Sequence, residues 1–415
     1  MLWTRDAEGH IDPRRATERR EQGLAVRLQS GERSWSESRD RCDTSSFADA
    51  LRRTARSLPT LPLPELEIRT DPWTGDPVAF DAAPPNVEEA LSARRVAFPY
   101  RIELTHHQRQ LVIVGPHIAP EPQQESFFSY RAEFGPATAA KTAARQVVGG
   151  LVPFTDDWER ALADQLARQL STRFRSREGA APSPGWTPLV LGPEAVAVLL
   201  HEAVAHALEV DLLARSGPVS AAIGHPLAPE NIDLLDDPAA APAAVRRTHD
   251  DEGTPTIRRW LLRGGRIAQP LCDQRGSLRN DVDPGAGRRA TRHDLPDPRS
   301  TCLHLLPGEG RLVDALSEKP GIYVDQVDAG SLQPLTGAVR LEVGCGRAFE
   351  NGELTDRLAP FVVVGHLANL LESISLVGAD LAECGAGWCA KNGQRLPVWA
   401  NVPFLRIEKA WVEPS

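Results

Sequence analysis

The clearest periodic pattern in the first half of the chain is an apolar stripe between residues 156 and 174. Its members recur at helical spacing among charged side chains, which predicts an amphipathic helix that packs on one face. The stripe consists of Trp158, Leu162, Leu166 and Leu170. Thr155 or Asp156 is placed to cap the N-terminus of this helix.

Weaker patterns precede this helix. Residues 47–58 carry apolar side chains at helical spacing and predict a short helix. Residues 96–104 and 111–114 have the composition of two strands, and the polar run between them predicts a turn. That turn contains His106 and His107, which we expect to face solvent rather than to bind a metal.

A change in composition divides the chain into two predicted domains. Residues 175–188 are rich in Arg, Gly, Ala, Ser and Pro and lack apolar periodicity, as is typical of a linker. We therefore expect an N-terminal domain over residues 1–185 and a C-terminal domain over residues 186–415. The second domain opens with a helix and continues as short strand-like runs, and Asn351-Gly352 predicts a hairpin turn. The strand-like runs are residues 321–327, 338–343, 360–364, 396–398 and 404–407.

Composition narrows the possible partners. The chain has 415 residues and a net charge of −9, from 47 basic and 56 acidic side chains, which argues against nucleic acid as a general partner. No apolar run is long enough to cross a membrane, and the first residues lack the apolar segment of a secretory signal. Six scattered cysteines do not form a disulfide framework. These features predict a cytoplasmic protein with no membrane or nucleic-acid partner.

The chemically informative segment is a predicted helix that begins at Gly192-Pro193. Projected at about 100° per residue, its apolar residues fill one arc, while the opposite arc carries two imidazoles and two carboxylates. These four residues are His201, Glu202, His206 and Glu209. The residues interspersed among them are mostly small, which leaves room for a metal ion and a substrate.

His201 and His206 are five residues apart, whereas the histidines of the common His-Glu-x-x-His zinc motif are four apart. Five residues correspond to roughly 140° around an ideal helix. For both histidines to bind one ion, the helix must widen locally into a π-type turn, a distortion that is frequent at functional sites. The spacing therefore predicts a π turn between the two imidazoles.

Zinc suits this set of residues. A catalytic zinc takes three protein ligands, imidazoles among them, and leaves a fourth position open. The third ligand would be Glu209 or a thiolate from the C-terminal region. Glu202, beside the first histidine, would accept a proton from the attacking water and pass it to the leaving nitrogen.

The segment from His201 to Asp211 resembles the zinc motif of the TldD/PmbA family of metallopeptidases. Further segments resemble motifs of the same family and follow in the same order, so that the agreement covers about residues 190–407. They are Asp250 to Thr256, Gly285 to Arg289, Pro296 to Arg299, Ser375 to Leu381 and the cysteine-bearing glycine loop from Gly387 to Gln394. Several motifs in the right order make the resemblance highly specific.

The resemblance implies a divergent, TldD-like subunit that binds one zinc ion per chain. The implied metal ligands are His201, His206 and Cys389. Glu202 is implied as the general base, and Glu209 would then orient an imidazole from outside the set of ligands. The other cysteines, Cys384 included, are expected to be buried small apolar residues.

The fold implied is α+β. It combines an N-terminal domain of helices on a curved mixed sheet with a C-terminal, largely antiparallel, barrel-like β domain that carries the zinc-binding helix. The activity implied is zinc-dependent hydrolysis of amide bonds in small or unfolded peptides, by trimming or by removal of leader segments. An extended peptide would pair its backbone with a strand edge. The partner implied is a TldE-like subunit in a heterodimer, with a homodimer as the alternative.

Two other functions stay open at this point. One is a zinc amide hydrolase that acts on a non-peptide natural-product intermediate, and the other is a non-catalytic subunit of a TldD/TldE-like complex. A DNA-linked role, which an older name of the family implies, is disfavoured by the acidic balance.

Several residues near the motifs have two interpretations. Acidic residues beside Gly-Thr-Pro usually form turns and caps, so we expect Asp250, Asp251 and Glu252 to do so rather than to bind a metal. Arg288 and Arg289 would bind substrate carboxylates or bridge the domains, and the sequence does not decide between these roles. His293 and His304 are candidate substrate contacts.

The chain also departs from the family pattern. Ala205, Ala207 and Val210 stand where glycines are usual, and we expect their side chains to narrow the approach to the metal. Residues 21–27 resemble a family strand, but fewer residues precede this strand than the family pattern leads us to expect.

Overall fold

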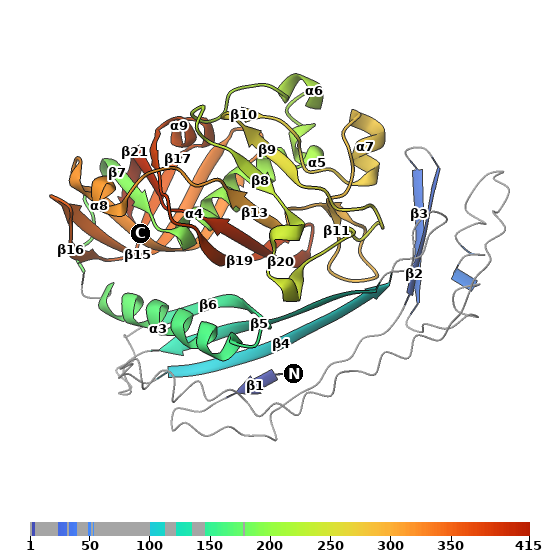
Figure 1. Cartoon of the computed structure of the whole chain (residues 1–415), viewed down its shortest axis with the longest axis horizontal. Coiled ribbons are helices and arrows are strands. Elements are labelled where there is room, and N and C mark those ends of the chain that lie inside the picture. Colours follow the sequence, from blue (N-terminus) through green and yellow to red (C-terminus); the bar gives the residue numbers. More distant parts are fainter. Residues whose placement is uncertain are drawn as a thin grey trace.

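The structure is a computed structural model. The residues that it describes are 2–4, 24–30, 33–39, 49–50, 53, 100–112, 122–134, 146–176 and 179–415. In this part of the chain the fold is mixed α/β and consists mostly of strands (Figure 1). The helix predicted at residues 47–58 lies almost wholly outside the described residues.

The N-terminal half contributes a four-stranded sheet, in the order β1–β4–β5–β6 (Figure 1). Its strands are β1 (Leu2–Thr4), β4 (Tyr100–Val112), β5 (Pro122–Phe134) and β6 (Gln146–Pro153). All neighbouring pairs are antiparallel, so the expectation of a mixed sheet was wrong for the described strands. Because β4, β5 and β6 are neighbours in the sequence as well as in the sheet, each reverses the direction of the one before it.

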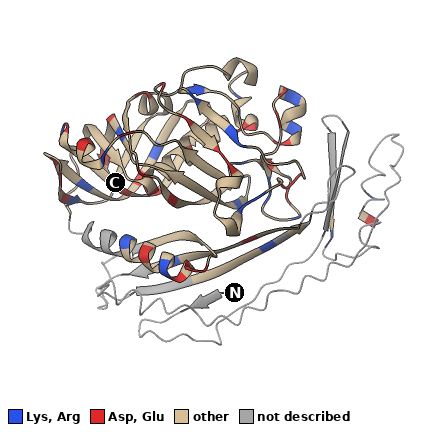
Figure 2. Ribbon diagram, in the orientation of Figure 1, with Lys and Arg blue, Asp and Glu red and all other residues tan. Residues whose placement is uncertain are grey.

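Helix α3 (Trp158–Ser176) covers one face of this sheet and confirms the predicted amphipathic helix. Trp158, Leu162 and Leu166 of its stripe are buried in one cluster with Phe128 and Tyr130, which alternate along β5 with residues on the other face. On that other face Phe127 packs with Trp399 of the C-terminal half. Acidic and basic residues alternate with other residues along the coloured part of α3 (Figure 2). The sheet therefore packs on α3 with one face and on the C-terminal domain with the other, and α3 also contacts β15 (Ala338–Glu350) and β16 (Glu353–Leu358) of that domain.

The turn predicted between residues 104 and 111 does not exist, because β4 continues through it in unbroken register with β5. His106 and His107 alternate onto opposite faces of the strand and are half-buried. The Nε2 atom of His106 lies 2.9 Å from Oγ of Ser126, and Nε2 of His107 lies 2.7 Å from Oγ of Ser129. These hydroxyl partners across the strands allow a polar run to stay in a sheet, and burial lowers the pKa of both histidines to about 4.

The C-terminal half contains a closed barrel of five strands, in the order β14–β7–β21–β17–β15 and back to β14. The strands are β7 (Gly185–Leu191), β14 (Gly321–Gln333), β15 (Ala338–Glu350), β17 (Phe361–His366) and β21 (Leu405–Pro414). Only the pairing of β7 with β14 is parallel in this ring. The predicted barrel-like, largely antiparallel sheet is thus present. Asn351 and Gly352, with φ of 54° and 85°, form the predicted hairpin turn between β15 and β16 (Glu353–Leu358).

A second sheet of six strands lies beside the barrel, in the order β10–β9–β8–β13–β20–β19. Its strands are β8 (Leu234–Asp236), β9 (Arg259–Arg263), β10 (Arg266–Ile267), β13 (Cys302–Leu305), β19 (Ala382–Lys391) and β20 (Gln394–Val402). Helix α4 (Pro193–Leu199) contacts β14 of the barrel and both β19 and β20 of the second sheet. The helix that carries the candidate metal ligands is therefore enclosed between two sheets.

The remaining elements are short. The helices are α5 (Val210–Leu213), α6 (Val219–Ala222), α7 (Gln274–Asn280), α8 (Leu312–Ser317) and α9 (Leu367–Glu372). The strands are β2 (Leu24–Ser30), β3 (Arg33–Arg39), β11 (Gly287–Arg288), β12 (Asp297–Pro298) and β18 (Ile374–Val377). Among the described residues, no helix is both long and apolar enough to span a membrane.

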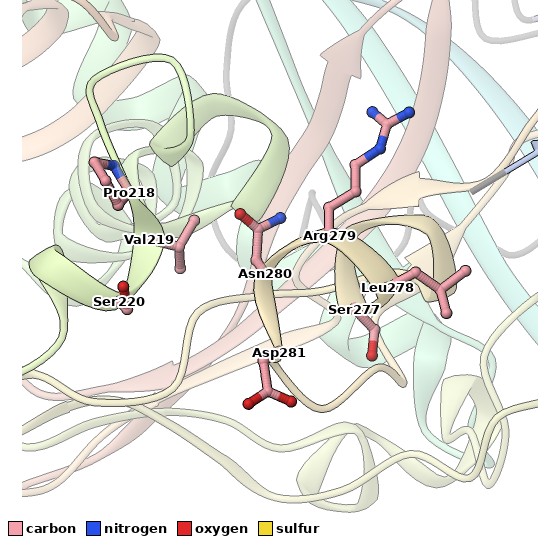
Figure 3. A pocket seen from close by; sticks show the side chains of 8 residues that line it. All are labelled: Pro218, Val219, Ser220, Ser277, Leu278, Arg279, Asn280 and Asp281. Atoms are coloured by element: carbon pink, nitrogen blue, oxygen red, sulfur yellow. The ribbon is translucent and has the colours of Figure 1, made fainter. Parts of the chain in front are cut away.

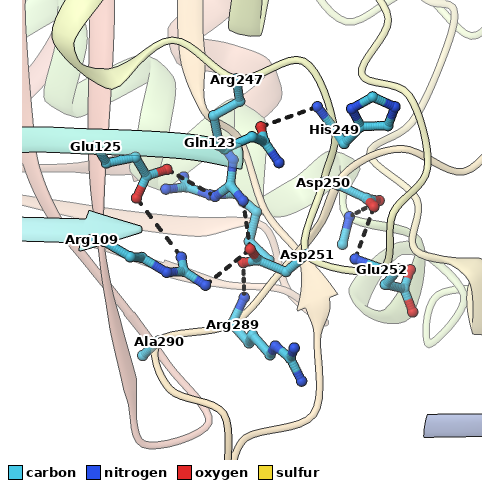
Figure 4. Close-up of polar contacts among 12 residues, drawn as sticks. Arg109, Gln123, Glu125, Arg247, His249, Asp250, Asp251, Glu252, Arg289 and Ala290 are labelled. Carbon is cyan, nitrogen blue, oxygen red and sulfur yellow. Dashed lines mark hydrogen bonds and ion pairs between the residues drawn. The ribbon is translucent and has the colours of Figure 1, made fainter. Parts of the chain in front are cut away.

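A buried network of ion pairs joins the N-terminal sheet to the C-terminal domain (Figure 4). Asp251 accepts hydrogen bonds from Arg109 of β4 at 3.0 Å, from Arg247 at 2.5 Å and from the backbone N–H of Arg289 at 2.8 Å. Arg247 also contacts Glu125 of β5 at 3.1 Å. Burial raises the pKa of Asp251, but the two arginines outweigh it and hold that pKa well below its ordinary value.

The neighbouring acids form turns, as predicted. The carboxylate of Asp250 accepts hydrogen bonds from the backbone N–H groups of Glu252, Thr254 and Gly287. Glu252 accepts the N–H of Gln274 at 2.6 Å. The expectation that these acids shape the loop is therefore confirmed.

Replacing Asp251 by alanine is expected to lower the free energy of unfolding by about 3 kcal/mol, because the buried guanidinium of Arg247 and the partly buried one of Arg109 lose their nearest carboxylate and keep only Glu125. Since the folded pKa of Asp251 lies below its unfolded value of about 4, its contribution is present above that pH and is lost as the pH falls. Urea denaturation at neutral pH measures the change. Asp314→Ala is the control, because its pair with Arg311 is exposed to solvent and contributes little to stability. Equal losses in the two variants would contradict the prediction.

Candidate metal centre

The helix widens where the sequence predicts that it should. Helix α4 ends at Leu199 and continues as a π-helical turn, η2 (Leu200–Ala205), followed by a 3₁₀ turn, η3 (His206–Leu208). The backbone N–H of His206 donates to the carbonyl of His201, five residues earlier. This bond brings the two imidazoles onto one side of the helix, with ring centroids 4.8 Å apart. The predicted π turn is confirmed.

The structure brings Cys389 to the two histidines. Cys389 lies on β19, and its Sγ is 3.5 Å from Nε2 of His206. One nitrogen of each imidazole and this sulfur all lie within 4.8 Å of one another. The side chain of Cys389 is fully buried, whereas Cys384, earlier on the same strand, makes its contact with the carbonyl of Ala382 instead.

His201 has the features of a metal ligand held in its neutral form. Its Nδ1 lies 3.2 Å from Oγ of Ser300, whereas its Nε2 is buried and has no hydrogen-bond partner. Burial lowers the pKa of His201 well below its ordinary value, and His206 and Arg299 lower it further. Buried polar atoms in proteins are nearly always satisfied. A cation bound by this nitrogen, by the imidazole of His206 and by the sulfur of Cys389 would satisfy it. The residues present therefore fit a zinc ion.

A chain of charged groups orients His206 by contacting its Nδ1 atom, on the other side of the ring from Cys389. Its Nδ1 lies 3.0 Å from Oε2 of Glu209, and the same carboxylate oxygen accepts a bond from Nζ of Lys391 at 2.8 Å. Lys391 also contacts Asp211 at 2.8 Å. Burial lowers the pKa of His206, but Glu209 and Cys389 outweigh it and raise the pKa to about 11. Glu209 thus engages the ring nitrogen that faces away from Cys389, which leaves Nε2 directed at the cluster.

Glu202 lies at the more open side of the cluster. Its Oε2 is 3.9 Å from Nε2 of His206, and its side chain retains 24% exposure against 11% for His206. Burial raises the pKa of Glu202, and His206 opposes that shift. Glu202 packs on β14 at Gly330, where an added Cβ would lie 2.8 Å from Cγ of the glutamate. A glycine is therefore needed at this position for the carboxylate to keep its place.

Three residues around the cluster were given no role by the sequence alone: Ser300, Arg299 and Lys391. Arg299 donates to Sγ of Cys389 at 2.7 Å, and its other terminal nitrogen donates to the carbonyl of Lys391 at 2.7 Å. All three residues are in or next to segments that resemble family motifs, but nothing in their spacing indicates a contact with the histidines. Only the fold reveals them as neighbours of the cluster.

Arg288 and the two further histidines lie outside the cluster. The guanidinium of Arg288 is buried and donates to the carbonyls of Ser300 and Pro397, so it bridges segments of the chain. Nδ1 of His293 lies 2.6 Å from Oγ of Ser38. His304 is on β13, paired with Leu235 of β8. None of the three belongs to the group of candidate ligands.

Two of the departures from the family pattern do not narrow the approach to the metal. Ala205 is fully buried in the main core cluster, and Val210 packs with Val219, Cys272 and Val282. The expectation was therefore wrong for these two residues, because the helix is packed on the side that an isolated helical projection leaves open.

Val219 also lines a surface hollow of about 670 Å³ between α6 and α7, which contains none of the candidate ligands (Figure 3).

Comparison with known proteins assigns the family. The model of the PmbA/TldA metallopeptidase C-terminal domain matches residues 184–413, which is more than half of the chain. The chain therefore belongs to the TldD/PmbA family.

Relatives with assigned names agree with this. The chain is 31% identical over 236 residues to a metalloprotease TldD homolog of Buchnera aphidicola subsp. Schizaphis graminum, a match that covers 56% of this chain and 49% of the relative. It is 25% identical over 252 residues to a zinc metalloprotease TldD homolog of Saccharolobus solfataricus, with 59% and 56% covered. The chain thus spans about half the length of the curated relatives that it matches.

Solved structures share the fold over nearly the whole chain. TldE from Thermococcus kodakarensis superposes with a TM-score of 0.71 at 17% identity and covers 99% of this chain and 93% of its own. A putative modulator of a DNA gyrase from Thermotoga maritima gives a TM-score of 0.71 at 16% identity, with the same coverage. At such identities the likeness establishes the fold.

Proposed function

We propose that this protein is a zinc-dependent peptidase that hydrolyses amide bonds in small or unfolded peptides. The observation that carries the proposal is the convergence of two imidazoles from one π turn with the sulfur of Cys389, around a buried nitrogen of His201 that has no partner. The metalloprotease names of the relatives and the family assignment support it. His201, His206 and Cys389 would hold one zinc ion per chain.

The proposed chemistry divides between the metal and one side chain. When bound, zinc polarises the substrate carbonyl and makes a water molecule a better nucleophile at neutral pH. Glu202 accepts the proton of that water and delivers it to the leaving nitrogen, which is the role of a general base and then of a general acid. Glu209 and Lys391 hold His206 in the tautomer whose Nε2 is directed at the cluster.

The proposed substrate is an extended peptide segment. Strand β14 pairs with β7 only from Ile322 to Val324, whereas it pairs with β15 as far as Gln333. In the described part of the chain, the edge of β14 beyond Val324 that faces away from β15 has no strand partner. Gly330, in that segment, packs directly on Glu202. An extended chain added to this edge would make backbone hydrogen bonds beside the carboxylate, which favours unfolded peptides over a particular sequence.

We also propose a TldE-like partner subunit, with a homodimer as the alternative. The likeness in fold to TldE supports this, because subunits of one family with the same fold commonly assemble around a pseudo-twofold axis. Purification from the native source with identification of the accompanying chain decides between the two assemblies.

The proposed function is tested by incubating the purified protein with unstructured peptides and following cleavage by mass spectrometry. Cleavage should stop when a chelator removes the metal and return when zinc is added back, and a tightly folded protein of similar composition should stay intact. Bound zinc without cleavage of any peptide would favour a non-peptide amide as the substrate. A folded protein that does not bind zinc would favour a non-catalytic subunit.

A further inference from the structure

Arg299 is the buried cation in direct contact with the candidate sulfur ligand. It follows β12 and its side chain has no exposed surface. Nη1 donates to Sγ of Cys389 at 2.7 Å, and Nη2 donates to the carbonyl of Lys391 at 2.7 Å. The backbone N–H of Arg299 donates to the carbonyl of Ala286, which anchors the residue to a neighbouring loop. One guanidinium thus bridges two positions of β19 that are two residues apart.

The chemistry of the two partners makes this contact unusual. A guanidinium is always charged and can only donate, and leaving it buried is costly unless an anion or several good acceptors face it. The acceptors of the Arg299 head group are one carbonyl and one sulfur, and the sulfur is the one that can carry a negative charge. A hydrogen bond from a charged donor is also stronger than one between neutral groups.

Hydrogen-bond partners distinguish Arg299 from two other buried arginines of the C-terminal domain. Arg288 donates to the carbonyls of Ser300 and Pro397. Arg259 is as deeply buried and donates to the carbonyls of Pro270 and Pro284. Both therefore bridge backbone segments only, whereas Arg299 contacts a candidate ligand atom.

We propose that Arg299 is a positioning residue that holds the sulfur of Cys389 in place for the metal and, by its hydrogen bond, weakens the donation of electrons from that sulfur to the metal. The inference rests on the proposed function, since it takes Cys389 as a metal ligand. Arg299 then sets both how tightly the metal is held and how strongly the metal attracts electrons from the substrate carbonyl. Partners of metal ligands typically change metal affinity by about 10–100-fold when they are removed.

The test uses cobalt(II), whose bond to a thiolate gives an absorption band in the near ultraviolet. The apo-protein and its Arg299→Met, Arg299→Gln and Arg299→Lys variants are titrated with cobalt(II), and zinc affinity is measured by competition with a chelator. In this band an electron moves from the sulfur to the metal. Loss of the charged hydrogen bond leaves the electrons of the bound sulfur less tightly held, so we expect the band to move to longer wavelength in the Met and Gln variants. Zinc binding should weaken by about 10–100-fold in both, because the sulfur is no longer held in place and this loss outweighs its stronger donation of electrons to the metal. Arg299→Lys, which keeps a charged donor, should restore the position of the band at least in part.

Arg259→Met is the matched control, because it removes an equally buried arginine that bridges carbonyls away from the cluster. Its cobalt spectrum should match that of the original protein. A band at the original wavelength in Arg299→Met, together with unchanged zinc affinity, would overturn the inference. If the Met variant does not fold, the same two measurements on Arg299→Gln test the inference. If the unsubstituted protein binds cobalt without any sulfur band, it is the proposed metal site itself that fails.

Discussion

Replacing Glu202 by glutamine is expected to lower the rate of peptide hydrolysis by roughly 10²–10⁴-fold and to leave the zinc content unchanged. Glutamine has nearly the same shape as glutamate but cannot accept a proton from water. Glu202 also stands outside the group of candidate ligands, with its carboxylate 3.9 Å from Nε2 of His206. Loss of activity with retention of metal is therefore the signature of a proton-transfer role.

The measurement is the rate of cleavage of an unstructured peptide, together with the zinc content of the same sample. Glu194→Gln is the matched control, because Glu194 is in the first turn of the same helix and is not among the candidate ligands. That variant should keep activity within a few-fold of the original. A Glu202→Gln protein that remains fully active would remove this carboxylate from the mechanism.

Replacing Cys389 by alanine is expected to reduce zinc binding by more than the roughly 100-fold that loss of an outer contact can cause, and to abolish peptide hydrolysis. The substitution removes the one candidate ligand that comes from β19 and leaves Nε2 of His206 without its sulfur neighbour. Two imidazoles from one helical turn would then be the remaining protein ligands, fewer than the three that catalytic zinc sites have.

Cys384→Ala provides the comparison within the same strand. Cys384 is also buried, but its sulfur lies 3.7 Å from the carbonyl of Ala382 and away from the candidate ligands. This variant should bind zinc as the original protein does, apart from any general loss of stability. Zinc content by mass spectrometry separates the two variants, and equal zinc in both would show that Cys389 is not a ligand.

The sequence predicted the site better than it predicted the first sheet. With a spacing of five residues, His201 and His206 cannot bind the same ion from a regular α-helix. The assumption that they bind one ion therefore predicts a π turn, which the structure contains. Local signals of this kind are strong because the geometry of a helix relates neighbouring side chains directly. Asn351-Gly352 is a second example, since a two-residue hairpin turn of type I′ needs positive φ at both positions, which Asn and Gly adopt readily.

The wrong predictions concern residues whose environment depends on contacts that are distant in the sequence. His106 and His107 look like turn residues, and only the serines and aromatic rings of the adjoining strand make a sheet position favourable for them. Val210 is expected to obstruct the approach to the metal, but its contacts with Val219, Cys272 and Val282 show that its side chain is buried in an apolar cluster. In each case a neighbour that is distant in sequence decides the environment.

The residues around the ligands were missed for the same reason. Arg299 reaches Cys389 from 90 residues away, and Lys391 reaches Glu209 from 182 residues away. Charged side chains in loops usually face solvent, so nothing in their own sequence neighbourhood distinguishes these two. Their burial and their partners become visible only when β19 is placed beside the π turn.

The central claim is that two imidazoles and one sulfur hold the same zinc ion, and X-ray absorption at the zinc edge tests it most directly. The account predicts zinc in near-stoichiometric amount, with one sulfur at about 2.3 Å and nitrogen or oxygen ligands at about 2.0–2.2 Å. A folded protein whose zinc has no sulfur neighbour, or which takes up no zinc at all, would contradict the account.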